Sequence, residues 1–170
     1  MKIKSKNATQ KLVLSSLVAA LICAATALIK LPTPLGYIHA GDAPVVLAAY
    51  LLSPTYGFLA AGLGSALADL LSGYALYAPA TFLIKGMMAL VAFAACRLLQ
   101  KRMGKLGSRL IGGVTAEILM IAGYFVFEGF LYGFGPSLVN IPANGVQGVA
   151  GIIVGMVLIK VFEKANITSE

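Results

Sequence analysis

Apolar residues run in long segments along the chain, and polar residues are confined to short stretches between these segments. The pattern predicts six membrane-spanning helices, at about residues 11–29, 43–52, 54–71, 79–99, 110–131 and 143–162. Pro54 and Pro79 suit the first turns of the third and fourth spans, because the first helical position does not need the N–H that proline lacks. The sequence therefore predicts an all-α integral membrane protein, with residues 1–170 forming a single six-helix domain.

Two of the predicted spans have alternative interpretations. The first span follows three lysines and ends near Ala25-Thr26-Ala27, which is also typical of a cleavable signal peptide. Its apolar run is longer than the roughly 7 to 15 residues of a signal peptide, which favours a retained helix. The second span is shorter than the about 20 residues that a crossing requires. It either lies in a locally thinned membrane or extends back into the preceding loop.

The charged residues are few, and their positions predict the orientation of the chain. Only 11% of the residues are charged, compared with about a quarter in soluble domains. Eleven of the thirteen Lys and Arg residues lie at the two termini and in the stretch from Arg97 to Arg109. By the positive-inside rule both termini are cytoplasmic, and the loops at 31–42, 72–78 and 132–142 are external. The same rule accounts for the net charge of +7 without nucleic-acid binding.

A group of polar side chains falls at one depth of this apolar chain, near the outer ends of the predicted spans. Its members are Asp42, Asp69, Lys85, Glu128, Asn140, Asn144 and Gln147. A charge inside a membrane costs at least about 2.5 kcal/mol, so such groups usually face a cavity and mark a pathway or a ligand site. The cluster predicts a site for something polar that arrives from outside.

Lys85, Asn144 and Gln147 are the strongest candidates for ligand contact within this cluster. Lys85 lies about six residues into its span, roughly 9 Å below the outer end, and Glu128 enters from the next span at a similar depth. Asn144 and Gln147 are three residues apart and share one helix face. The alternative to ligand contact is a structural polar bridge between helices, which membrane bundles also use.

The remaining polar residues admit more than one role. Asp42 precedes the second helix and is expected to cap its backbone N–H groups. Asp69 is expected to pair with Lys85, to fix the following loop, or to contact a ligand. Tyr74 and Tyr77 on that loop either stack on a flat ring or belong to an interfacial aromatic belt.

Glu117 lies apart from the polar cluster, and the single histidine argues against catalysis. Glu117 lies closer to the cytoplasmic side than the cluster, where it caps a helix, pairs with Arg97 or faces a partner subunit. His39 is the only histidine in the chain, so a zinc site or a histidine-based hydrolase has no supporting residues. We therefore expect neither an enzyme nor a metal site.

Small residues recur at a four-residue spacing that allows helices to approach closely. The pairs are Ala20 and Ala24, Ala60 and Gly64, Ala92 and Cys96, and Gly151 and Gly155. In a chain so rich in alanine and glycine, internal packing explains most of them.

Several segments, in this order, resemble the S components of energy-coupling factor (ECF) transporters, which are six-helix membrane proteins that capture vitamins. The segments are residues 39–44 (HAGDAP), 65–74 (SALADLLSGY), 78–86 (APATFLIKG) and 144–148 (NGVQG). The resemblance covers nearly the whole chain. It implies that the external loops 31–42 and 72–78 cover the substrate, which brings His39, Tyr74 and Tyr77 to the site. It also implies that Ala20 and Ala24 form the Ala-xxx-Ala motif that docks the coupling subunit.

The resemblance further implies how the protein works. An S component of this kind sits in the cell membrane and acts with a transmembrane coupling subunit and two ATP-binding subunits. The chain has no phosphate-binding loop of the G-x-x-x-x-G-K-[ST] type, so ATP and Mg²⁺ are expected in the partners and no cofactor in this chain. The pattern is closest to members associated with hydroxymethylpyrimidine, a thiamine precursor, or pyridoxine. Riboflavin or another vitamin is the alternative, as is a stand-alone ion-coupled carrier with Glu117 and Glu128 as relay carboxylates.

Overall fold

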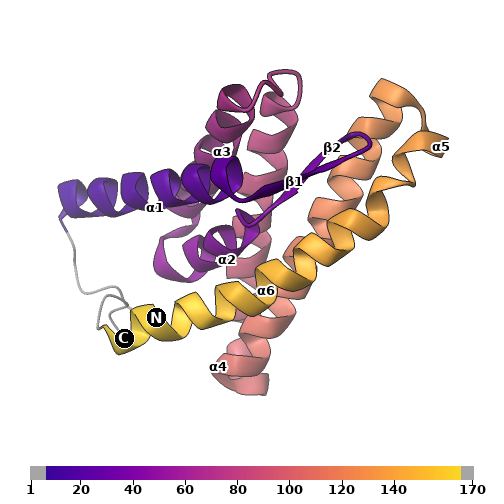
Figure 1. The fold of residues 1–170 in the computed structure, drawn as a ribbon. Coiled ribbons are helices and arrows are strands. Elements are labelled where there is room, and N and C mark those ends of the chain that lie inside the picture. Colours follow the sequence, from indigo (N-terminus) through magenta and orange to yellow (C-terminus); the bar gives the residue numbers. More distant parts are fainter. Residues whose placement is uncertain (1–6, 166–170) are drawn as a thin grey trace.

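The computed structural model describes residues 7–165 as a helical bundle with a small β-hairpin at one end (Figure 1). In chain order the elements are α1 (Ala8–Leu28), β1 (Lys30–Thr33), β2 (Gly36–His39), α2 (Asp42–Leu51), α3 (Pro54–Leu71), α4 (Ala78–Tyr132), α5 (Phe134–Ser137) and α6 (Asn140–Lys164). Helix lies within each of the six ranges predicted from the apolar runs. The predicted helical architecture is therefore confirmed in its main features.

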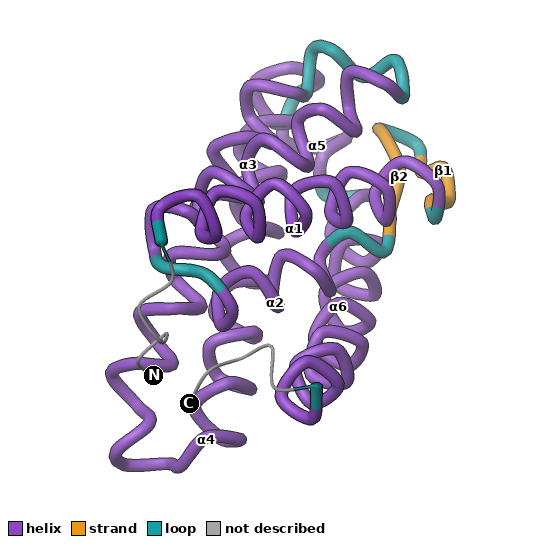
Figure 2. The backbone as a smooth tube through the Cα atoms, turned by 90° about the vertical axis from the view of Figure 1, so that its left-hand side faces the viewer, coloured by secondary structure: helices purple, strands orange, loops and turns teal. Residues whose placement is uncertain are grey.

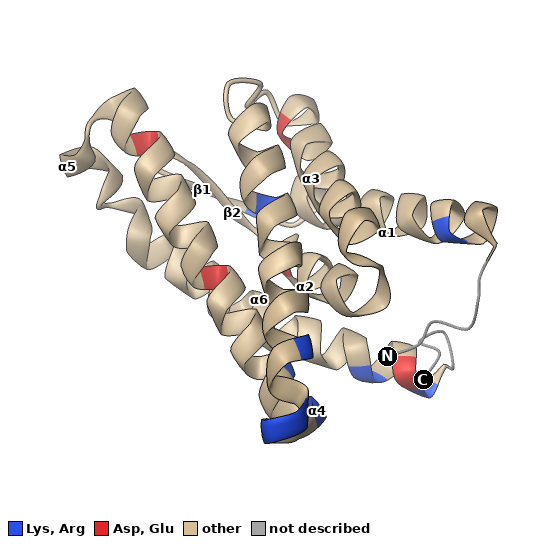
Figure 3. Cartoon of the chain, turned by 180° about the vertical axis from the view of Figure 1, so that it is seen from behind, with Lys and Arg blue, Asp and Glu red and all other residues tan. Residues whose placement is uncertain are grey.

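The predicted fourth and fifth spans are the two arms of α4, which reverses direction at Gly104. This residue has φ +69° and ψ −179°, outside helical geometry, and glycine adopts such a positive φ without steric cost. The connection between the two predicted spans, residues 100–109, is helical on both sides of that one residue. Figure 3 shows basic residues gathered at this turn.

Helix α2 is enclosed by the rest of the protein, which explains its length. All ten of its residues are buried, and it packs against α1, α3, α4 and α6, as Figure 2 shows. Because its sequence is apolar on every side apart from Asp42 and Tyr50, no face of this helix needs water. The extension into the preceding loop is therefore wrong, since α2 begins at Asp42 and β2 ends three residues earlier.

Glycines permit the closest helix contacts. A Cβ at Gly64 of α3 would lie 2.5 Å from the carbonyl oxygen of Ala19 in α1, and one at Gly155 of α6 would lie 3.1 Å from the carbonyl of Ala43 in α2. Neither position has room for a side chain without a shift of backbone. Internal packing is thus confirmed for these two members of the four-residue pattern.

The loop expected at 31–42 contains an antiparallel β-hairpin, so an all-α description of the fold is incomplete. Lys30 pairs with His39 and Leu31 with Ile38 across β1 and β2. Figure 1 shows the hairpin running from the end of α1 toward α6. A two-stranded hairpin is only marginally stable alone, so it depends on its contacts with the helices.

Three helical stretches within residues 7–165 are long and apolar enough to cross a membrane by length and composition. They are Ala8–Leu28, the whole of α4, and Phe134–Lys164, and α2 is a shorter apolar helix. The basic residues Lys2, Lys4 and Lys6, which entered the prediction of orientation, lie outside the described residues.

Candidate functional site

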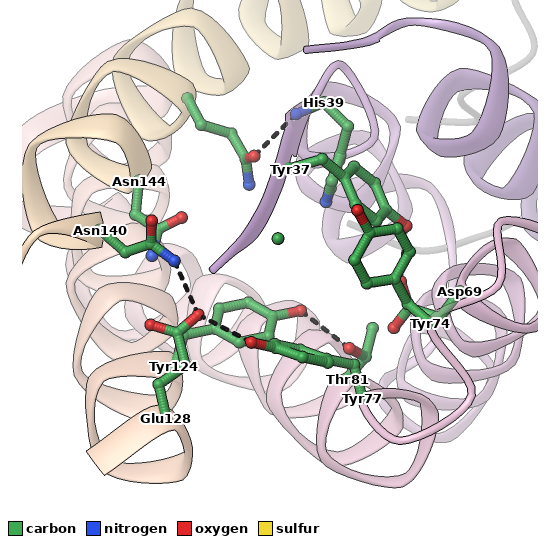
Figure 4. Close-up of a pocket in the computed structure, with 12 residues that line it drawn as sticks. Tyr37, His39, Asp69, Tyr74, Tyr77, Thr81, Tyr124, Glu128, Asn140 and Asn144 are labelled. Carbon is green, nitrogen blue, oxygen red and sulfur yellow. Dashed lines mark hydrogen bonds between the residues drawn. The ribbon is translucent and has the colours of Figure 1, made fainter. Parts of the chain in front are cut away.

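The hairpin covers a cavity between α3, α4 and α6 (Figure 4). It holds about 390 Å³ of empty space, part of it open to the solvent. Four tyrosines and two carboxylic side chains dominate its wall. The lining residues are Gly36, Tyr37, His39, Asp69, Tyr74, Tyr77, Thr81, Tyr124, Glu128, Asn140, Asn144 and Gln147.

Three hydrogen bonds fasten the hairpin over the cavity. The Tyr37 hydroxyl donates to Asp69 Oδ1 at 2.6 Å, which joins the hairpin to α3. The backbone N–H of His39 donates to Gln147 Oε1 at 2.8 Å, which joins it to α6. The Tyr77 hydroxyl donates to the carbonyl of Leu35, in the turn between the strands, at 2.5 Å. The hairpin is therefore tied to three different walls of the cavity.

A buried ion pair lies beneath the cavity and belongs to neither the hairpin nor the lining. Lys85 Nζ donates to Asp42 Oδ1, and both side chains are fully buried. Gln147 Nε2 donates to the other Asp42 oxygen at 2.6 Å. Because Gln147 also accepts from His39, the chain of contacts runs from Lys85 through Asp42 to the hairpin. Lys85 therefore forms a polar bridge between α4 and α2, the alternative to ligand contact.

The expected capping role of Asp42 is wrong. Gly41 occupies the cap position of α2, and the helix has no side-chain capping bond there. Both oxygens of Asp42 are taken by Lys85 and Gln147 instead. The expected pairing of Asp69 with Lys85 is wrong, because Lys85 bonds Asp42 instead. The Asp69 side chain accepts from Tyr37 and so holds the hairpin rather than the loop that follows α3.

The opposite wall is built from α4 and α6. Glu128 Oε1 accepts from Asn140 Nδ2 at 2.9 Å. The Tyr77 hydroxyl, which donates to Leu35, lies 3.5 Å from the same oxygen. Deeper on α4, the hydroxyls of Thr81 and Tyr124 share a hydrogen bond of 3.0 Å. The Lys85 ammonium lies 5.5 Å from the centre of the Tyr124 ring, and Tyr124 itself lines the cavity.

Glu117 lies beside the ion pair rather than apart from it. A Cβ at Gly151 of α6 would meet Asp42 Cβ at 2.8 Å and Glu117 Oε1 at 3.0 Å, so both acidic side chains flank the same glycine. Glu117 also packs against Gly148. The depth argument that separated Glu117 from the polar cluster is therefore wrong.

The environment of the hairpin shifts two pKa values. Burial and the Asp69 carboxylate raise the pKa of Tyr37, which keeps its hydroxyl a donor. Burial and the nearby Lys85 ammonium lower the pKa of His39 to about 4. The Nδ1 atom of His39 accepts the N–H of Gly41 at 3.1 Å, a bond that only the neutral ring can make.

Comparison with known proteins identifies the family. A family model described as the S component of an ECF-type riboflavin transporter matches residues 6–164. The chain belongs to this family. S components of this kind are membrane-embedded, bind a small-molecule vitamin, and work with ECF transmembrane and ATPase modules.

Two relatives and one solved structure are similar to this chain. The S component is 36% identical over 132 residues to an uncharacterised protein of Pyrococcus woesei, a match that covers 76% of this chain and 86% of that relative. It is 23% identical over 126 residues to the thiamine precursor transporter HmpT of Lactococcus lactis subsp. cremoris, covering 74% and 69% of the two chains. A solved structure of the S component of a bacterial ECF transporter superposes with a TM-score of 0.75 at 24% identity. That match covers 96% of this chain and all of the other, and it shows a shared fold.

The structure of this S component brings most of the predicted site residues to the cavity wall. The predicted residues on the wall are His39, Asp69, Tyr74, Tyr77, Glu128, Asn144 and Gln147. Lys85 and Asp42 lie beneath it. Sequence reasoning missed Thr81 and Tyr124, each of which lies four residues before a predicted residue of α4, Lys85 or Glu128. A search of the same helix face would have found both.

Two further residues of the wall carried a different interpretation. A tyrosine near the membrane boundary is typical of an interfacial aromatic belt, yet Tyr37 lines the cavity and donates to Asp69. Asn140 was part of the polar cluster without an assigned role, and it supports Glu128. Ala20 and Ala24 are exposed on α1, whose buried residues Ser15, Val18, Ile22 and Thr26 lie on another face.

Proposed function

We propose that this S component captures a vitamin with a single nitrogen-containing ring, hydroxymethylpyrimidine or pyridoxine, for an ATP-driven ECF importer. The observation that carries the proposal is the cavity under the hairpin. Tyrosine rings and a few polar side chains line it, a wall that suits a small flat heterocycle. The similarity to the thiamine precursor transporter HmpT supports the same substrate class.

The wall chemistry is consistent with such a ring. Tyr37 and Tyr74 lie with ring centres 4.8 Å apart, and Tyr74 and Tyr77 with ring centres 6.1 Å apart, so three aromatic faces cluster at the cavity. Aromatic side chains stack on flat heterocycles, and nearby polar groups fix the orientation of the ring. His39, Asp69, Asn144 and Gln147 are the polar groups that we propose for this role, together with Glu128.

In this proposal the chain is one domain with six membrane crossings and both termini in the cytoplasm. The cavity then opens to the outside, and the turn of α4 with its basic residues faces the cytoplasm. The exposed Ala20 and Ala24 dock the transmembrane coupling subunit, and two ATP-binding subunits bind ATP and Mg²⁺. This chain contributes substrate binding and needs no cofactor.

Calorimetric titration of the purified protein in detergent tests the proposal. Hydroxymethylpyrimidine and pyridoxine are titrated into the wild type, into Asn144→Trp, which fills the cavity, and into Gly145→Ala. Gly145 is the control because a Cβ there meets nothing within 4 Å. We expect binding to the wild type and the control, and a loss of at least tenfold in Asn144→Trp. No binding of either vitamin to the wild type would refute this substrate class.

Riboflavin is the second candidate, favoured by the description of the matching family model. Riboflavin has three fused rings, so we expect its binding to displace the hairpin farther than binding of a one-ring vitamin does. Riboflavin is therefore included in the same titration.

A stand-alone ion-coupled carrier would be supported by a different result. Vesicles that hold this chain alone would then take up the bound vitamin, and collapse of the proton gradient would abolish the uptake.

A further inference from the structure

Glu117 is a buried carboxylic side chain that does not line the cavity. It is only 4% exposed, and neither of its carboxyl oxygens has a hydrogen-bond partner among the described residues. It lies on the second arm of α4, eight residues after Arg109, which is about 12 Å along the helix. A buried polar atom is normally paired, so the two oxygens require an explanation.

The surroundings of Glu117 place it beside the buried ion pair. Asp42 of α2 and Lys85 of the first arm of α4 are the charged groups that act on it. A Cβ at Gly148 of α6 would lie 3.1 Å from Glu117 Oε2. A Cβ at Gly151 would lie 3.0 Å from Glu117 Oε1 and 2.8 Å from Asp42 Cβ. Both oxygens therefore lie against a face of α6 that offers no side chain as a donor.

The charges of these groups balance only if one of the two acids is neutral. Lys85 supplies one positive charge, and Asp42 balances it in a direct ion pair. An ionised Glu117 would add a second negative charge, with no hydrogen bond from Lys85 to hold it. An isolated buried charge is so costly that such a group normally becomes neutral instead.

A protonated Glu117 has an acceptor beside it. The neutral carboxyl carries one O–H donor, and an ionised carboxylate offers about four acceptor positions. Asp42 uses one position for Lys85 and one for Gln147, so it can accept a further hydrogen bond. The arrangement thus suits one proton shared between two neighbouring acids.

We propose that Glu117 is a proton-binding site, which holds a proton in the folded protein while Asp42 is the counter-ion of Lys85. The two acids can exchange these roles. When residue 42 carries no charge, Glu117 releases its proton to the solvent and becomes the counter-ion of Lys85. The proton therefore keeps the support beneath the hairpin electrically neutral. This site does not depend on which vitamin binds in the cavity.

Infrared difference spectroscopy of the purified protein in detergent tests the proposal. The carbonyl stretch of a protonated carboxylic acid is separate from the bands of carboxylates and amides, and it shifts when the acid proton is exchanged for deuterium. At neutral pH, we expect the wild-type spectrum minus that of Glu117→Gln to contain this band. Glu163→Gln is the control, because it removes a carboxylate that pairs with Arg109, and no acid band should be lost there. Absence of an acid band from Glu117 would overturn the proposal.

The variant Asp42→Asn tests the exchange of roles. We expect the acid band of Glu117 to disappear from its spectrum, because Lys85 then requires Glu117 as its counter-ion. Glu117→Gln should also lower the melting temperature more in Asp42→Asn than in the wild type. An acid band that persists in Asp42→Asn, or equal shifts of the melting temperature in the two backgrounds, would contradict the exchange.

A second sample decides the question if Glu117→Gln does not give a monodisperse species. The chain has four glutamates, so replacement of Glu128, Glu163 and Glu170 by Gln leaves Glu117 as the only one. An acid band that moves when glutamate is labelled with carbon-13 at its side-chain carboxyl then belongs to Glu117. If no acid band moves on labelling, Glu117 is ionised and the proposal is wrong.

Discussion

Lys85 and Asp42 form an ion pair between α4 and α2, 43 residues apart in the chain, with both side chains fully buried. Gln147 bonds the same carboxylate and the backbone of His39, so the pair supports the hairpin above it. Removing one partner of a buried pair leaves an uncompensated charge, which typically costs about 3 to 5 kcal/mol. We therefore expect Lys85→Met to lower the thermal stability of the detergent-purified protein strongly.

The double variant Lys85→Met with Asp42→Asn distinguishes a role of Lys85 in supporting the hairpin from a direct contact of Lys85 with the ligand. It removes both charges while an amide can still bond Gln147, so most of the lost stability should return. If Lys85 acts only through Asp42, the double variant also regains substrate affinity. Restored stability with affinity still lost by tenfold or more would instead assign Lys85 a direct contact with the substrate.

Tyr37 is expected to control how long a substrate remains in the cavity. Tyr37→Phe removes the 2.6 Å bond to Asp69 that ties the hairpin to α3. A hydrogen bond to a charged group contributes about 1.5 to 3 kcal/mol, so the dissociation rate should rise roughly tenfold or more. Stopped-flow measurement of release checks this, with Tyr56→Phe, which lines a separate pocket beside α1, as the control. Equal release rates in the two variants would argue against this role of the hairpin.

Substrate affinity should fall at acidic pH because of His39. The pKa of His39 is about 4 with the hairpin closed and ordinarily 6.5. Between pH 4 and pH 6.5, His39 therefore binds a proton more readily when the hairpin is open than when it is closed. The closed form therefore keeps its full stability above pH 6.5 and loses it as the pH falls toward 4. A shift of one pKa unit corresponds to about 1.4 kcal/mol, so affinity at a pH of about 5.5 should be roughly tenfold lower than at neutral pH.

The variant His39→Asn tests this explanation. Asn offers an oxygen that accepts the Gly41 N–H as Nδ1 does, but it does not titrate in this range. Calorimetry is carried out on both proteins at each pH. Protonation of the substrate itself then affects both proteins equally and does not contribute to the difference between them. An identical pH dependence in wild type and variant would show that His39 is not responsible.

Docking to the coupling subunit should depend on the exposed alanines of α1. Ala24→Trp places a large ring on that face, so it should block co-purification of the coupling subunit while substrate binding stays within twofold of the wild type. Ala94→Trp, at an exposed alanine of α4, is the matched control. Normal complex formation by Ala24→Trp would refute the docking role.

Much of the helical fold could be predicted from the sequence because hydropathy and proline positions act locally. Pro54 begins α3, as expected, and the apolar run before it is α2. The hairpin was missed because Pro32 and Pro34 indicate only where a helix is disfavoured. Its strands are four residues each and are held by distant partners such as Asp69 and Gln147, which no local pattern reveals.

The candidate site could be predicted as a set of residues but not as a set of contacts. Depth along each helix grouped Asp69, Glu128 and Gln147 correctly at one end of the bundle. The position of a residue along its helix does not show how far the hairpin extends into the bundle. It therefore does not show at which depth of the bundle α2 begins. For that reason the partners of Asp42 and the place of Glu117 beside it could not be derived from spacing alone.

Mass spectrometry of the small molecules that co-purify with the protein tests the central claim most directly. The wild type and Asn144→Trp are purified in parallel from cells that make these vitamins, denatured, and analysed for released compounds. We predict that a one-ring nitrogen heterocycle with amino or hydroxymethyl groups is released from the wild type in near-equal molar amount, and not from the variant. Release of riboflavin, or of no compound that distinguishes the wild type from Asn144→Trp, would contradict the account.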